Sequence, residues 1–389
     1  MRVAFVLHLA RHDGAGKAIL ELLDVLRKSN VEAFVIVPGR GPLVSDLESR
    51  AAAVTVIPYR WWADRDTPLW KKALRSCWNL IMVLPVSVVV WRWKCELVYT
   101  NTMTVCVGAL AAKLLGLPHV WHFHELWGGE TGFEFDLGER LSLCLVDRLS
   151  HVCIANSGTV AERLAGAIRP DKLRVAYQSV TLREPTTGRE APVTRLEQAA
   201  TVCLVVASIL PLKRQEDAVR AVALLKRQGV SAELWLVGDD TGPYAQQLRS
   251  LAASEDVEAE VRFLGFHENP LPLQRAADLV LSCSPVEAFG RATVEAMLAG
   301  KPVIAGRGGG NGELVEDGVT GLLYQSGDCS DLARCISFLA ENPGERTRLG
   351  ANARGWAKSR FSASEYGRVV LDVLESALRR SAPSAGQLD

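Results

Sequence analysis

Residues 284–300 read Ser-Pro-Val-Glu-Ala-Phe-Gly-Arg-Ala-Thr-Val-Glu-Ala-Met-Leu-Ala-Gly and carry two glutamates, Glu287 and Glu295, eight positions apart. The apolar run 278–283 before them predicts a buried parallel strand, and 291–298 predicts a helix. Glu287 is therefore expected in the loop at the carboxyl end of a strand, where open α/β sheets bind ligands. Glu295 is expected inside the helix that follows.

The loop and the start of this helix also form a predicted anion site. Backbone amides near Phe289, Gly290 and Arg291 open a helix N-terminus, where phosphates bind. Two carboxylates around an anion site suit a ligand with hydroxyls at both ends and phosphates between them, which is the layout of a sugar nucleotide. The alternative is that both glutamates only complement helix dipoles. The glycine-rich run 306–310 is a second candidate anion loop, although such runs are more often turns.

The spacing of residues around the two glutamates matches a family pattern. Glu-x7-Glu within Ser-x-x-Glu-x-Phe-Gly, followed by Glu-Ala-Met-x-x-Gly-x-Pro-Val, is present at 284–303. Further matches at fixed spacing are Gly309, Gly310, Glu313, Leu314, Val315, Asp317, Gly318 and Gly321. The segment 276–324 thus resembles the donor-binding core of glycosyltransferase family 4, retaining enzymes of the GT-B fold. The resemblance implies that Glu287 holds the sugar hydroxyls, that Glu295 holds the ribose hydroxyls, and that no metal or other cofactor is needed.

Composition fits a folded two-domain α/β protein. The chain has 389 residues, 48% apolar and 23% charged, with no net charge, so nothing supports nucleic-acid binding. Nine cysteines without a Cys-x-x-Cys pair predict reduced thiols in a cytoplasmic setting, and the N-terminus lacks the features of a secretion signal. Apolar strands alternate with helical patterns in both halves. This alternation, with the resemblance, predicts two Rossmann-like, doubly wound parallel-sheet domains facing a central cleft.

The domain boundaries follow from changes in composition. We expect an acceptor-binding domain over 1–181, a Pro- and Thr-containing linker over 182–198, and a donor-nucleotide-binding domain over 199–363. The resemblance implies that a helix at 364–380 packs back on the first domain. Residues 381–389 are expected to form a flexible tail.

Basic residues after the first strand of the second domain extend the predicted donor site. Lys213 and Arg214 lie in the first strand-to-helix connection, where a lysine can reach phosphates as a point charge. The family has Gly-Arg after this strand, and Ala207 and Ser208 stand there instead. Arg214 or Arg291 would then have to supply the missing cation. The alternative is a solvent-exposed basic helix start.

Two strand ends of the first domain carry further candidates. Gly14 and Gly16 follow the first strand, where the family has its Gly-Gly donor loop; the alternative is a tight turn. The strand ending in Trp-His-Phe-His-Glu at 121–125 places His122 and His124 on the same side. The resemblance implies that His124 lies near the reacting sugar, and the alternative is a structural histidine.

Residues 59–94 combine aromatic and basic side chains. They hold six tryptophans, Trp61, Trp62, Trp70, Trp78, Trp91 and Trp93, and seven cations, Arg60, Arg65, Lys71, Lys72, Arg75, Arg92 and Lys94. Tryptophan among basic residues favours an anionic membrane interface. The apolar run 80–91 is shorter than the ~20 residues that a membrane span needs, so 80–90 is interpreted as a core helix. The Trp-rich basic flanks are the predicted peripheral membrane contact.

The sequence thus predicts a cytoplasmic, retaining, metal-independent glycosyltransferase with His124, Lys213 and Glu287 as catalytic residues. The donor would be a UDP- or GDP-sugar. The acceptor would be a saccharide or lipid-linked saccharide of cell-surface polysaccharide or lipid-linked glycan synthesis. The alternatives are a non-catalytic partner subunit of a glycosyltransferase, which Ser208 in place of arginine favours, and a sugar-nucleotide epimerase or phosphorylase of similar architecture.

Overall fold

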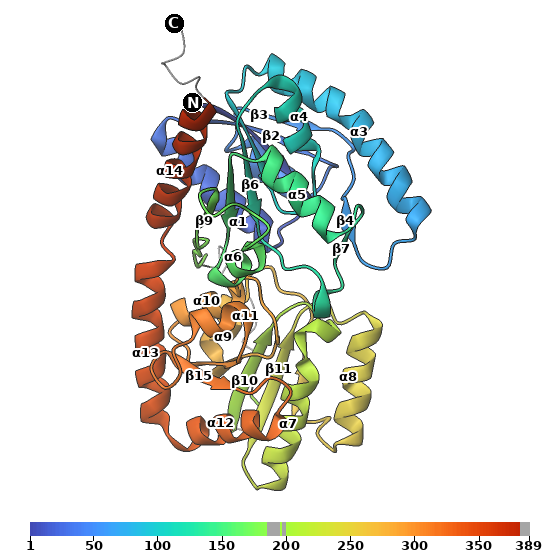
Figure 1. The fold of residues 1–389 in the computed structure, drawn as a ribbon. Coiled ribbons are helices and arrows are strands. Elements are labelled where there is room, and N and C mark those ends of the chain that lie inside the picture. The colour runs from blue at the N-terminus through green and yellow to red at the C-terminus, as the bar shows by residue number, and fades with distance from the viewer. Residues whose placement is uncertain (185–194, 197–199, 382–389) are drawn as a thin grey trace, which may run out of the picture. The chain divides into compact units, whose positions relative to one another are not determined.

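The computed structural model describes most of the chain, namely residues 1–184, 195–196 and 200–381 (Figure 1). The chain divides into two compact units, one formed by Met1–Ser179 with Ser362–Asp389 and the other by Val180–Phe361. Most of the linker expected at 182–198, and the tail expected at 381–389 apart from its first residue, lie outside the described residues.

The first unit contains a seven-stranded parallel sheet in the order β3-β2-β1-β5-β6-β8-β9. The bounds of these strands, in sheet order, are Ala53–Val56, Glu32–Val37, Arg2–Leu7, Leu97–Asn101, His119–Phe123, Val152–Ala155 and Leu173–Val175. A short antiparallel pair, β4 (Ala63–Asp64) and β7 (Glu134–Phe135), lies outside this sheet. The helices are α1 (Gly14–Leu26), α2 (Leu43–Glu48), α3 (Leu69–Arg92), α4 (Val107–Leu115), α5 (Glu139–Leu149), α6 (Gly158–Leu164) and α14 (Ala363–Ser381), with 3-10 turns η1 (Arg27–Ser29) and η2 (Gly129–Thr131).

Both faces of this sheet are buried, which explains why its strands read as nearly continuous apolar runs. Successive side chains of a strand point to opposite faces. Phe5 of β1 joins one apolar cluster with residues of α1 and α14, and Val6 joins a second cluster with residues of α3 and α4. The helix expected at 364–380 is α14, and it packs against α1 so closely that a Cβ at Gly367 would lie 2.1 Å from Val25 Cγ1.

The second unit contains a six-stranded parallel sheet in the order β12-β11-β10-β13-β14-β15. The bounds of these strands, in sheet order, are Val261–Phe263, Ala232–Val237, Thr201–Val206, Leu279–Ser282, Val303–Gly306 and Gly321–Tyr324. The helices are α7 (Gln215–Arg227), α8 (Pro243–Ser254), α9 (Leu271–Ala276), α10 (Arg291–Leu298), α11 (Gly309–Leu314), α12 (Cys329–Glu341) and α13 (Pro343–Arg360), with the 3-10 turn η3 (Pro211–Lys213). The predicted helix 291–298 is therefore α10, with the same bounds.

Strand order fixes where each sheet can bind a ligand. In the second unit β10 pairs with β11 on one side and with β13 on the other, so the chain reverses direction along the sheet between β10 and β13. In the first unit the same reversal lies between β1 and β5, because β1 pairs with both β2 and β5. Ligands of open α/β sheets bind beyond the carboxyl ends of the strands at such a switch point.

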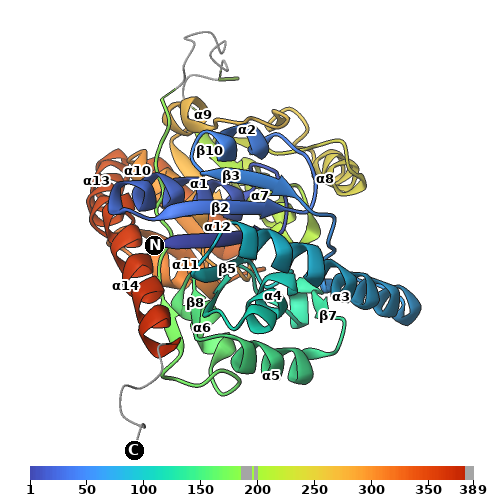
Figure 2. The same cartoon turned by 90° about the horizontal axis from the view of Figure 1, so that it is seen from above.

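One expectation about the first unit holds for only one face of a helix. The run 80–90 was interpreted as a core helix, but it belongs to the 24-residue helix α3, whose length and composition alone would allow it to cross a membrane. Val83, Val86 and Val90 are buried, whereas Leu84 and Val88 are exposed. A run that is apolar at every position gives a helix two apolar faces, and only one of them is covered here. Both views place α3 at the edge of its unit beside α4 (Figures 1 and 2).

Candidate active site

The loops that leave β10 and β13, on the two sides of the switch point, bring Lys213 and Glu287 together. Lys213 ends η3, and its Nζ lies 2.5 Å from Glu287 Oε1. Both side chains are mostly buried, with 24% and 19% exposed. Two residues 74 positions apart thus form one partly buried ion pair where a nucleotide is expected. The sequence placed each residue at a strand end, but their contact depends on β10 and β13 being neighbours.

The start of α10 supplies the predicted anion site. Gly290 caps this helix with φ of +97°, a left-handed conformation that glycine adopts without strain. The first-turn amides of α10 follow directly after it. Arg291, the first residue of α10, pairs with Glu295 one turn further along: its Nε lies 3.3 Å from Glu295 Oε1, and both side chains are largely buried. Phe289, just before the cap, is buried and its ring lies 5.5 Å from that of Phe361.

Arg214 has a structural partner. Its Nε and Nη2 lie 3.0 Å and 2.9 Å from the two carboxylate oxygens of Asp217, whose side chain is fully buried. This hydrogen bonding raises the pKa of the guanidinium above its ordinary value. Asp217 also accepts hydrogen bonds from Tyr324 Oη and the Gly327 amide. Arg214 and Arg291 thus both have carboxylate partners in this structure, and Lys213 is the cation paired with Glu287.

The glycine-rich run after β14 has a role that the sequence reading missed. A Cβ at Gly309 would lie 2.7 Å from both Glu287 N and Glu287 O, and a Cβ at Gly310 would lie 2.5 Å from Phe289 O. The Gly310 amide donates a hydrogen bond to Glu287 O at 2.7 Å. These glycines let the start of α11 approach the backbone of the Glu287 loop, so close packing requires Gly309 and Gly310, a role that differs from both the anion loop and the turn considered from the sequence.

Asn311 is a site residue that sequence reasoning did not identify. It is fully buried, and its Oδ1 accepts a hydrogen bond from Thr293 Oγ1 of α10 at 3.0 Å. Its Nδ2 donates to Ser282 Oγ of β13 at 3.1 Å. The side chain therefore ties together the three elements that position Glu287. Its place directly after the glycine run was the only signal in the sequence.

The first unit carries its own polar cluster, around His124. His122 and His124 point to the same side as predicted, with ring centroids 4.0 Å apart. His124 Nε2 lies 2.8 Å from Asn101 Oδ1, and its Nδ1 lies 2.5 Å from Gln178 Nε2. Burial lowers the pKa of His124 well below its ordinary value, so the ring is neutral near pH 7. Nε2 then donates to the asparagine oxygen, and Nδ1 accepts from the glutamine amide.

An acid–histidine contact lies at the start of α1. His8 Nε2 lies 3.0 Å from Asp13 Oδ2, and the other oxygen of Asp13 caps the helix by accepting from the Gly16 amide at 2.6 Å. A Cβ at Gly16 would lie 2.2 Å from Arg11 O, whereas nothing lies within 4 Å of a Cβ at Gly14. Gly16 is therefore required by the turn itself. The sequence reading did not identify the His8–Asp13 pair.

The stability of the first unit should depend on pH through His8. Burial lowers the pKa of His8, but the hydrogen bond to Asp13 and its charge outweigh burial, so the pKa is raised above 6.5. The same contact outweighs burial for Asp13, whose pKa is lowered although burial raises it. A raised histidine pKa stabilises the fold below the unfolded value, and this is lost as the pH rises through the folded value. We expect His8→Gln to lower Tm more at pH 6 than at pH 8.5, measured by differential scanning fluorimetry.

Asp13→Asn is the matching variant for this prediction, because it removes the partner and leaves the histidine. It should show the same pH dependence, since Asp13 is ionised at both pH values. A His8→Gln difference in Tm that is equal at pH 6 and pH 8.5 would contradict the prediction.

The two sheets, each reversing its strand order beside a cluster of polar side chains, define a protein of the GT-B class with two Rossmann-like units. Sequence profiles described as Glycosyltransferase Family 4 and Glycosyl transferases group 1 match residues 12–184 and 189–356. The chain therefore belongs to the group 1 glycosyltransferases of family 4.

Individual relatives agree with this assignment. The D-inositol 3-phosphate glycosyltransferase of Actinosynnema mirum is 37% identical over 276 residues, which are 65% of each chain. The chain thus spans just under two thirds of that relative's length. The enzyme of the same name from Saccharomonospora viridis is 30% identical over 296 residues, 70% of this chain and 68% of the relative. The crystal structure of Anabaena HepE with UDP is 26% identical, covers 97% of this chain and 100% of its own, and has a TM-score of 0.79.

Proposed function

We propose that the protein transfers a sugar from a nucleoside diphosphate sugar to a hydroxyl acceptor, with retention of anomeric configuration and without a metal. The observation that carries this proposal is the Lys213–Glu287 pair at the switch point of the second unit, directly before the glycine-capped start of α10. A cation, helix amides and a carboxylate are the groups that a diphosphate next to sugar hydroxyls requires.

The residues have distinct proposed roles. Lys213 and the first amides of α10 stabilise the charge that develops on the diphosphate leaving group. Glu287 accepts hydrogen bonds from the hydroxyls of the transferred sugar, and Glu295 accepts those of the ribose. His124, which the resemblance places near the reacting sugar, is neutral and does not act as a charged acid; both of its ring nitrogens are engaged by Asn101 and Gln178, so its proposed role is to shape that side of the site. Gly14 and Gly16 remain proposed donor contacts on the family resemblance alone.

The proposed donor carries uridine. Structures of Anabaena HepE were solved with UDP and with UDP-glucose, and the latter is 28% identical to this chain with a TM-score of 0.78. This supports a UDP-sugar over a GDP-sugar. We further propose that the protein acts in the cytoplasm and that its acceptor is a saccharide or lipid-linked saccharide of cell-surface glycan synthesis, with peripheral contact between the first unit and the membrane.

A thermal-shift series with UDP, GDP and ADP tests the donor. A ligand at about 100 times its Kd stabilises the protein by ~2.7 kcal/mol, which is a rise in Tm of several degrees for a unit of this size. UDP should give the largest rise, and Lys213→Ala should remove most of it. If no nucleoside diphosphate changes Tm, the protein is a non-catalytic partner subunit, the alternative that Ser208 favours. Sugar release from the donor without an acceptor, or epimerisation of the donor, would indicate the remaining alternative.

A further inference from the structure

Helix α3 presents an uncovered apolar face along its whole length. Trp70, Leu74, Ile81, Leu84, Val88 and Trp91 are 51–70% exposed. At 3.6 residues per turn they lie on one side of the helix, and we call them the apolar stripe of α3. The 24 residues of the helix extend ~36 Å at 1.5 Å per residue. An exposed apolar face this long on a folded unit marks an interaction surface.

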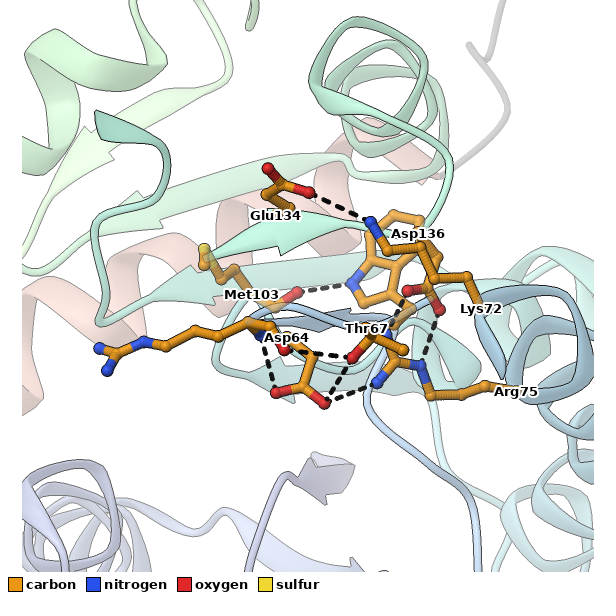
Figure 3. Close-up of polar contacts among 9 residues, drawn as sticks. Asp64, Thr67, Lys72, Arg75, Met103, Glu134 and Asp136 are labelled. Carbon is orange, nitrogen blue, oxygen red and sulfur yellow. Dashed lines mark hydrogen bonds and ion pairs between the residues drawn. The ribbon is translucent and has the colours of Figure 1, made fainter. Parts of the chain in front are cut away.

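The opposite face of α3 is fixed to the protein, so the stripe cannot turn inward. Val83, Val86 and Val90 pack in the cluster that includes α4. At the N-terminal end, Arg75 forms ion pairs with Asp64 of β4 and with Asp136, and Lys72 Nζ lies 3.1 Å from Glu134 Oε2 of β7 (Figure 3). The Arg75 side chain is 13% exposed and that of Asp136 1% exposed, so this contact is part of the fold.

Most of the tryptophans in the flanks of 59–94, which were expected to contact a membrane, instead contact other residues of the protein. Trp62 is buried, and its Nε1 donates to Met103 O at 2.6 Å. Trp61 Nε1 donates to His8 O at 3.0 Å, and the Trp93 ring lies 5.2 Å from Phe34. The exposed tryptophans at the two ends of the stripe, Trp70 and Trp91, are the ones placed for a membrane contact.

Charge indicates what covers the stripe. The sequence of α3 contains four Lys or Arg and no Asp or Glu. Lys72 and Arg75 face the protein, where they pair with acids, so no charged side chain lies within the stripe itself. Lys71 and Arg92 lie at its two ends, and within the part of the chain that the structure describes neither forms an ion pair. Pairing with a second copy of α3 would bring cations near cations and bury no acid. An apolar surface with tryptophan and cations at both ends matches the interface of an anionic bilayer.

We propose that α3 docks lengthwise on an anionic lipid bilayer, with its apolar stripe in the headgroup region and Lys71 and Arg92 against lipid phosphates. This proposal deepens the peripheral membrane contact of the proposed function and rests on it in that respect; because the contact depends on α3 alone, it can be tested separately from the transfer reaction. It places the first unit at the surface of a membrane, where a lipid-linked acceptor would be available.

Vesicle cosedimentation tests the proposal, using vesicles of 70% phosphatidylcholine and 30% phosphatidylglycerol. The full-length protein should cosediment, and Ile81→Glu/Leu84→Glu should bind at least about tenfold more weakly, because each glutamate would bring a charge into the headgroup region. The control Val319→Glu/Phe338→Glu changes two exposed apolar residues outside the stripe and should bind like the wild type. Vesicles of phosphatidylcholine alone should bind more weakly.

A second measurement uses the tryptophans themselves. Brominated lipids should quench the fluorescence of the wild-type protein, and most of this quenching should be lost in Trp70→Phe/Trp91→Phe, which remains apolar. Equal cosedimentation of the stripe variant and the wild type would overturn the proposal. The proposal would also be overturned if the wild-type protein were a dimer that does not bind vesicles and if the stripe variant were a monomer. Thermal shifts with UDP on the same samples separate a failure of docking from a failure of donor binding.

Discussion

Glu287→Ala should lower the rate of sugar transfer about 10²–10³-fold, the loss seen when one group that stabilises a transition state is removed. Glu287 is the carboxylate that Lys213 contacts at 2.5 Å, and its removal leaves both the proposed sugar contact and the lysine without a partner. Initial rates with the nucleotide sugar that gives the largest thermal shift measure the effect on kcat. Glu295→Ala should instead raise the KM for the donor and leave kcat largely unchanged.

A matched control for Glu287 is Glu260 in the same unit, which lies 3.0 Å from Lys226. Glu260→Ala removes a lysine–glutamate pair away from the switch point and should keep the wild-type rate. With Lys213→Ala and the double variant Lys213→Ala/Glu287→Ala, these measurements form a double-mutant cycle. The two losses should add only in part, because the side chains have separate proposed contacts with the donor but share one ion pair. A Glu287→Ala enzyme with wild-type kcat and KM would disprove the role of this carboxylate.

Gly310→Ala should abolish most of the thermal shift given by UDP and should also lower Tm in the absence of ligand. The new methyl group would lie 2.5 Å from Phe289 O, so either the Glu287 loop or the start of α11 must move. Overpacking of this kind costs about 1–3 kcal/mol, which corresponds to a fall in Tm of several degrees. Differential scanning fluorimetry with and without UDP measures both effects.

Gly312→Ala is the control for this glycine, because nothing lies within 4 Å of a Cβ at that position of the same helix. It should keep the wild-type Tm and the full UDP shift. If Gly310→Ala behaved like Gly312→Ala, the close packing of α11 on the Glu287 loop would not be needed for donor binding.

Local sequence patterns were enough for most of the second unit near the site. The strand before Glu287, the glycine-capped helix α10 and its bounds could all be predicted, because each depends on residues that are neighbours in the chain. The short strands β9 and β15 were not identified. β9 contains Arg174 and an exposed Val175, so its sequence shows no buried apolar run to recognise.

Partners far apart in the sequence could not be predicted from these patterns. Asp217, the carboxylate partner of Arg214, also accepts hydrogen bonds from Tyr324 Oη and the Gly327 amide, which lie 107 and 110 positions further along the chain. The glycine run was left open between an anion loop and a turn, because nothing in it shows which backbone it will contact. Likewise, periodicity cannot tell which apolar face of α3 is covered, since both faces satisfy the same pattern.

The sequence by itself determined the family, the two α/β units, and the loops at strand ends that carry Lys213, Glu287 and His124. Tertiary structure decided which of these residues are in contact, why Gly309 and Gly310 must be glycine, and that one side of α3 remains exposed. The physical reason is that secondary structure and helix capping depend on interactions between nearby residues, whereas ion pairs, close backbone packing and burial depend on the order of strands in a sheet and on which helix covers which face.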